Sequence, residues 1–136
     1  MAETSDRAPA RPTSSGFGRV LVAVYGIFAL AATSRSAVQI ATQFHQAPLA
    51  YLLSAFAAVV YVVATVSLGR GNATSRRVAT VAISIELVGV ITVGAASELF
   101  SEAFPDATVW TGFGSGYGFV PLVLPLVGLW WLRHTR

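Results

Sequence analysis

The chain has 136 residues, of which 54% are hydrophobic and only 11% are charged. Soluble domains carry about 25% charged residues, and a small soluble domain must cover its surface with polar groups. The composition therefore excludes a soluble globular domain, and the same hydrophobic content excludes disorder for the body of the chain. Cysteine is absent, which excludes disulfide, thiol and Cys-based metal chemistry.

Residues 1–16 have no apolar period and predict a disordered cytoplasmic tail. Four apolar segments follow, at about 17–42, 48–68, 77–97 and 115–133. Roughly 20 apolar residues span a bilayer as a helix, and in lipid a helix satisfies its own backbone hydrogen bonds. The sequence therefore predicts an all-α, polytopic membrane protein in which residues 17–136 form an antiparallel bundle of four transmembrane helices.

The first apolar segment has an alternative interpretation, a cleaved signal peptide. Basic residues precede the segment, and Ala29, Leu30 and Ala31 match the A-x-A cleavage pattern. Because alanine is common in this chain and the apolar pattern continues beyond the match, we favour a first transmembrane helix.

The arginines, which are the only basic residues besides histidine, have a one-sided distribution. If the N-terminus is cytoplasmic, four spans return the C-terminus to the same side, and the inside then holds Arg7, Arg11, Arg19, Arg70, Arg76, Arg77, Arg133 and Arg136. The outside holds Glu98, Glu102 and Asp106, with Arg35 near that side. The positive-inside rule therefore predicts that both termini are cytoplasmic. A pI of about 10.0 would suggest nucleic acid in a soluble protein, but these arginines adjoin apolar runs, so we expect the lipid bilayer as partner and no nucleic acid.

Glu86 lies near the middle of the third apolar segment. An acid at this depth costs on the order of 3 kcal/mol on an insertion scale, so the segment needs partners. Helical spacing places Glu86 on a face of small residues, which we expect to pack inward because small residues allow close helix approach: Ala82, Gly89, Val93 and Ala96. The opposite face is expected to meet lipid: Val81, Ile85, Val88 and Leu99.

Two roles are open for Glu86. The functional interpretation is a proton or cation site, since an intramembrane acid is a functional-site hypothesis by default. The structural interpretation is a neutral acid that is hydrogen-bonded to a neighbouring helix. Tyr61 on the second segment reaches a similar depth, and Tyr25 on the first lies somewhat nearer the cytoplasm. Both are candidate partners.

Arg35 and Gln39 follow helical spacing and predict a polar stripe on the outer third of the first helix. One interpretation is a snorkelling arginine that pairs with Glu98 or Glu102 at the outer interface. The other is an outward-facing vestibule, lined by Arg35, Gln39 and Glu98, that contacts an anion or a lipid headgroup.

Residues 110–119 combine aromatic side chains with glycines at alternate positions: Gly112, Gly114, Gly116 and Gly118. Glycine disfavours helix and permits tight backbone, so this stretch is a candidate re-entrant loop, and such breaks often line binding sites. The alternative is an interfacial aromatic loop that leads into a Pro-kinked helix. We expect Trp110, Phe113 and Tyr117 at the outer interface, and Trp130 and Trp131 at the inner one.

The four-span layout, the arginine-only basic content and the stretch FPDATVWTGFGSGYGFVP at residues 104–121 resemble small uncharacterised membrane proteins of actinobacteria. This resemblance implies a bacterial plasma membrane protein and implies no activity. Small multidrug transporters also use a membrane Glu, but theirs lies in the first helix. The Gly-rich and Phe-box patterns of fluoride channels are not found in this chain.

Chemical site motifs are sparse. His45 and His134 fall at opposite membrane sides and cannot meet at a metal, and no Ser–His–acid or paired-carboxylate arrangement is evident. We therefore expect no enzyme activity, no metal and no cofactor. The favoured function is a non-enzymatic accessory or assembly protein that contacts other membrane proteins or its own copies. The alternative is a small oligomeric proton- or ion-coupled transporter or channel that uses Glu86.

Overall fold

The computed structural model describes residues 16–103, 108 and 110–135, and this part of the chain is built from helices and contains no β-strand. The predicted tail lies outside the described residues, apart from Gly16. The elements in chain order are α1 (Phe17–Gln43), the 3-10 helix η1 (Phe44–Gln46), α2 (Pro48–Arg70), α3 (Ala73–Leu99), the 3-10 helix η2 (Ser101–Ala103), the 3-10 segment η3 (Thr111–Tyr117) and α4 (Val120–His134).

The connection between α2 and α3 follows from local chemistry. Helix α2 ends at Arg70 and is followed by Gly71, whose φ of 70° is left-handed and therefore suits a residue without a Cβ atom. Asn72 then caps α3, because its side-chain oxygen accepts a hydrogen bond of 2.8 Å from the backbone nitrogen of Ser75. Two residues thus reverse the chain and produce a tight helical hairpin.

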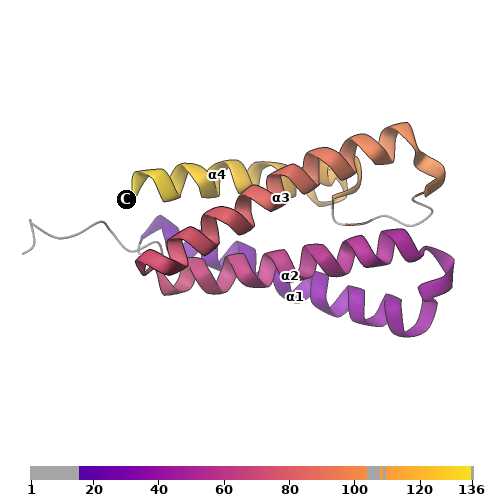
Figure 1. The fold of residues 1–136 in the computed structure, drawn as a ribbon, viewed down its shortest axis with the longest axis horizontal. Coiled ribbons are helices and arrows are strands. Elements are labelled where there is room, and N and C mark those ends of the chain that lie inside the picture. The colour runs from indigo at the N-terminus through magenta and orange to yellow at the C-terminus, as the bar shows by residue number, and fades with distance from the viewer. Residues whose placement is uncertain (1–15, 104–107, 109, 136) are drawn as a thin grey trace, which may run out of the picture.

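The long helices run back and forth along one direction (Figure 1). Helix α1 packs most extensively on α2, while α3 packs on α2 at one side and on α4 and η3 at the other. Direct contact between α1 and α4 is sparse and includes the Phe17 and Trp131 rings, whose centroids lie 5.5 Å apart.

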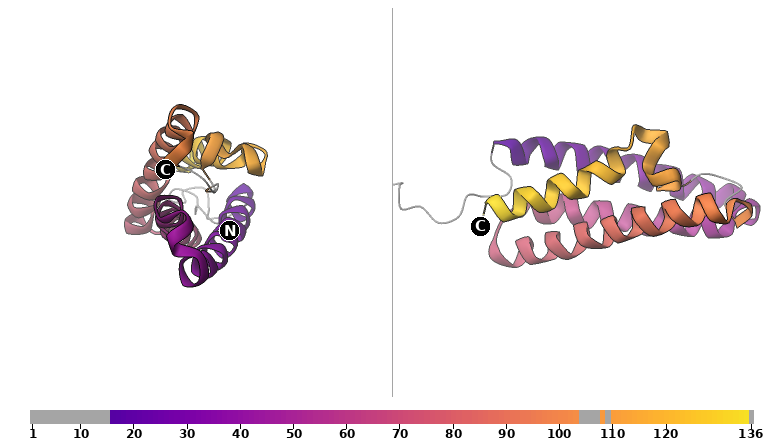
Figure 2. Two further views of the ribbon diagram at one scale, coloured as in Figure 1. Left: turned by 90° about the vertical axis from the view of Figure 1, so that its right-hand side faces the viewer. Right: turned by 90° about the horizontal axis from the view of Figure 1, so that it is seen from above.

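One end of the molecule gathers the start of α1, the end of α2, the start of α3 and the end of α4 (Figures 1 and 2). Arg76 links two of these termini, since its guanidinium donates hydrogen bonds to the Leu132 carbonyl at 2.6 Å and to the Thr135 hydroxyl at 2.9 Å. Because the described arginines other than Arg35 all lie in these helix termini, we call this the arginine end: Arg19, Arg70, Arg76, Arg77 and Arg133.

Among the described residues, three helical stretches are long and apolar enough to cross a membrane: Phe17–Gln46, Pro48–Arg70 and Ala73–Leu99. A fourth span arises only if η3 and α4, which meet at a bend of 96°, are counted together. Helix α4 alone has 15 residues, or about 22 Å at 1.5 Å per residue, which is short of a hydrocarbon core of about 30 Å. The segment expected at about 115–133 is therefore not one straight helix.

The two faces expected for α3 agree with its side-chain burial. Ala82, Glu86 and Val93 are buried, whereas the opposite face is exposed, with Val88 at 64% and Leu99 at 74%. Large apolar side chains are likewise exposed on the other three long helices, for example Leu30, Val59 and Leu126. An outer surface of this kind is suited to lipid.

Candidate functional site

Glu86 is the central residue of the 27-residue helix α3, and its side chain is fully buried. The hydroxyl of Tyr25 on α1 donates a hydrogen bond of 2.7 Å to Glu86 Oε1. Tyr25 is fully buried as well. The structure thus brings together two of the three residues proposed from the sequence for this site, across a separation of 61 positions.

Tyr61 on α2 adjoins this pair. Its ring centroid lies 6.1 Å from that of Tyr25, and its hydroxyl accepts a hydrogen bond of 3.0 Å from the indole nitrogen of Trp110. Tyr61 is close enough to the Glu86 carboxyl group to interact with it, but not in hydrogen-bond geometry. We call Tyr25, Tyr61, Glu86 and Trp110 the buried polar cluster.

Trp110 does not take the interfacial position that its aromatic neighbourhood suggested. It is only 1% exposed and lies inside the helix packing. Two features account for this placement: the Tyr61 hydroxyl provides an acceptor for the indole N–H, and Gly89 of α3 leaves space for the ring, because a Cβ atom added there would lie 2.5 Å from a Trp110 ring carbon. Gly94 provides the same space for Phe113.

One carboxylate oxygen of the buried polar cluster has no hydrogen-bond partner. Tyr25 satisfies Glu86 Oε1 and Trp110 satisfies the Tyr61 oxygen, but Glu86 Oε2 is buried without a hydrogen-bond partner. An unsatisfied buried polar atom costs free energy and calls for an explanation. The cluster therefore holds three helices and the segment before η3 together, and it has one unused position for a proton or a hydrogen-bond donor.

The residues proposed for an outer vestibule are spread over the end opposite the arginine end. Arg35 donates a hydrogen bond of 2.7 Å to the Tyr117 hydroxyl of η3. Gln39 Oε1 is buried without a partner, and Glu98 is exposed near the end of α3, beside Gly112. The space that Arg35 lines has a volume of about 20 Å³, which is enough for a single water molecule.

Three of the four glycines proposed for a re-entrant loop have positive φ angles: Gly112, Gly114 and Gly118. A Cβ atom at Gly114 would lie 2.8 Å from the ring of Pro121, so the first turn of α4 packs directly on this backbone. Gly116 has neither a positive φ nor a close neighbour. These conformations produce the bend between η3 and α4.

Sequence reasoning missed the role of Phe113 and Phe119, which have left-handed φ angles of 61° and 60°. Such angles are rare for bulky residues, and no pattern in the sequence marks them. Gly89 and Gly94 indicate that α3 has space for neighbouring side chains, but the sequence alone does not show which aromatic ring occupies each space.

No group of three or more potential ligand side chains of His, Asp or Glu forms a metal site in the part of the chain that the structure describes. His45 lies in η1, at the end opposite His134 of α4.

Comparison of the chain with protein-family models, with curated proteins and with solved structures finds no match in any of the three. The class of protein therefore follows from the structure itself. An all-helical chain with three to four helices that are able to cross a membrane has the character of a multi-pass membrane protein.

Proposed function

We propose that the chain is an integral protein of the bacterial plasma membrane, an antiparallel bundle of four transmembrane helices with both termini in the cytoplasm. The arginine end supports this orientation, because all its charged side chains are basic in the described residues. The described acidic residues other than Glu86 are Glu98 and Glu102, and both lie toward the opposite end. This asymmetry follows the positive-inside rule.

Within the membrane we propose a non-enzymatic accessory or assembly role, in which helix faces contact other membrane proteins or further copies of the chain. One observation supports this role most: the outer surface is apolar and grooved, while the buried polar cluster is enclosed between the helices. A large apolar surface with its polar groups used internally is suited to association rather than to catalysis.

A pull-down in mild detergent tests the accessory role. We expect a specific membrane protein to be recovered with the tagged chain in a fixed stoichiometry, and to be absent when an unrelated polytopic protein carries the same tag. Quantitative mass spectrometry of the eluate measures both. Recovery of the homo-oligomer alone would contradict a partner-dependent role.

The second candidate function is proton- or ion-coupled transport through an oligomer, with Glu86 as the coupling residue. It is favoured by a specific observation, the buried Glu86 Oε2 that has no hydrogen-bond partner. Intramembrane acids commonly mark proton and ion pathways, and the adjacent hydroxyls of Tyr25 and Tyr61 are groups through which a proton can be relayed.

Flux through proteoliposomes tests the transport candidate. If Glu86 couples transport, Glu86→Gln abolishes proton-coupled flux, because the amide cannot release a proton, while the variant remains folded. Glu98→Gln is the matched control, since it removes an exposed acid from the same helix and should leave the flux unchanged. Absence of flux in the unmodified protein for cations, anions and cationic drugs would refute this candidate.

A further inference from the structure

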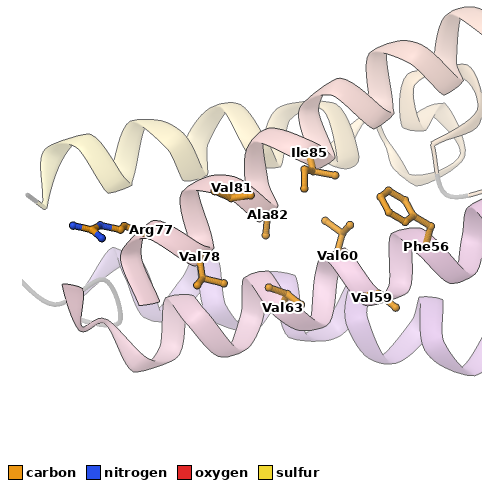
Figure 3. A pocket seen from close by; sticks show the side chains of 9 residues that line it. All are labelled: Phe56, Val59, Val60, Val63, Arg77, Val78, Val81, Ala82 and Ile85. Atoms are coloured by element: carbon orange, nitrogen blue, oxygen red, sulfur yellow. The ribbon is translucent and has the colours of Figure 1, made fainter. Parts of the chain in front are cut away.

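An apolar groove of about 390 Å³ runs between α2 and α3 on the outer surface (Figure 3). Valine side chains of both helices line it, with Phe56 at one end and Arg77 at the other. The groove continues past Ile85 toward Trp110 as a second apolar space of about 590 Å³. Arg77 therefore lies at one end of a long apolar groove that is open to the outside of the helix bundle.

A third space, of about 930 Å³, lies on the other side of α3, against α4. Its floor is apolar, with Val81, Leu129 and Leu132, and its rim carries Arg76, Arg77 and Arg133. Among the residues that the structure describes, no acidic one lines this space or the α2–α3 groove. Arg77 and Val81 line both, so the two meet at the start of α3.

The arginines of this rim have different tasks. The Arg76 side chain binds the end of α4 through its hydrogen bonds to Leu132 and Thr135. The side chains of Arg77 and Arg133 are exposed and make no hydrogen bond or ion pair with the described residues. Two guanidinium groups that line one space, with no acidic side chain among its described lining residues, are suited to bind phosphate.

We propose that this region binds one anionic glycerophospholipid, with its phosphate between Arg77 and Arg133 and an acyl chain in the α2–α3 groove. The distance along α3 from Arg77 to Ile85 is about 12 Å at 1.5 Å per residue, close to the depth of one leaflet, which is half of a hydrocarbon core of about 30 Å. Basic pockets between helices at a membrane surface recognise anionic headgroups by charge. The lipid site goes beyond the proposed function and holds for either candidate.

Native mass spectrometry of the full chain in detergent, titrated with phosphatidylglycerol or phosphatidylcholine, tests the headgroup contact. We expect preferential retention of phosphatidylglycerol, and a roughly 25-fold loss of its affinity in the R77Q/R133Q double variant. The matched control is Arg19→Gln, which removes an exposed arginine of the same end but on α1. Unchanged affinity in the double variant, or an equal loss in the control, would overturn the proposal.

Val81→Trp tests the acyl-chain contact, since Val81 lines both spaces and is 59% exposed, so that a larger side chain fills the groove without disturbing the core. We expect at least a tenfold loss of phosphatidylglycerol affinity with no change in helix content. Leu30→Trp on α1, an exposed position outside these spaces, is the matched control. If Val81→Trp leaves lipid affinity intact and instead changes the oligomeric state, the groove takes a helix and the lipid proposal fails.

Discussion

Replacement of Glu86 by alanine is expected to destabilise the protein by about 2–4 kcal/mol. The substitution removes the acceptor of the Tyr25 hydroxyl, which is fully buried. It also leaves a cavity at the centre of α3, where helices α1 and α2 meet it. The free energy of unfolding in detergent, measured by denaturant titration and circular dichroism, checks this result.

Two controls separate the hydrogen bond from the loss of volume. Glu86→Gln keeps a carbonyl oxygen for Tyr25, so we expect it to cost less than about 1 kcal/mol. Val90→Ala removes buried volume one turn further along α3 without removing a hydrogen-bonding group, and is expected to cost about 1–2 kcal/mol. If Glu86→Ala is no less stable than Val90→Ala, the Tyr25 hydrogen bond does not stabilise the fold.

The second large effect is expected at Gly89. Gly89→Ala adds a methyl group 2.5 Å from a Trp110 ring carbon, so that the indole must move and its hydrogen bond to Tyr61 is lost. Overpacking and the lost hydrogen bond together should cost about 2–3 kcal/mol, after a gain in helix propensity. In a background with Trp130 and Trp131 replaced by Phe, the fluorescence emission of Trp110 should shift to longer wavelength.

Gly69→Ala is the matched control for this prediction. Gly69 is also helical, in α2, but an added Cβ atom there has no neighbour within 4 Å. The same substitution should therefore be neutral or stabilise by up to about 1 kcal/mol. Equal effects at Gly69 and Gly89 would show that Trp110 does not depend on the space at Gly89.

Features that depend on the position of a residue along its helix could be predicted from the sequence. A count of 1.5 Å per residue places Tyr61 at a depth similar to that of Glu86 and Tyr25 somewhat nearer the cytoplasm, and the structure brings the three side chains together in the core. The burial of the small-residue face of α3 was predictable for the same reason, since helical period and residue size set it.

Features set by loops were not predictable in this way. From hydropathy alone, Trp110 is an amphipathic side chain that is expected at an interface. A hydropathy pattern contains no information on the acceptor at Tyr61 or on the space at Gly89. Similarly, charge patterning did not indicate the hydrogen bond that Arg35 donates to the hydroxyl of Tyr117. Left-handed angles at Phe113 determine where the aromatic residues of η3 point, and no residue pattern encodes them.

The placement of Trp110 and Phe113 on glycines of α3 also implies an order of biogenesis. Their binding surface is made of two helices that come earlier in the chain, since α3 provides the space and α2 provides the Tyr61 oxygen. Helix α4 is too short to cross a membrane by itself, so it depends on the segment before it for its position. Residues 110–135 thus pack on a surface that α2 and α3 must provide before these contacts can form.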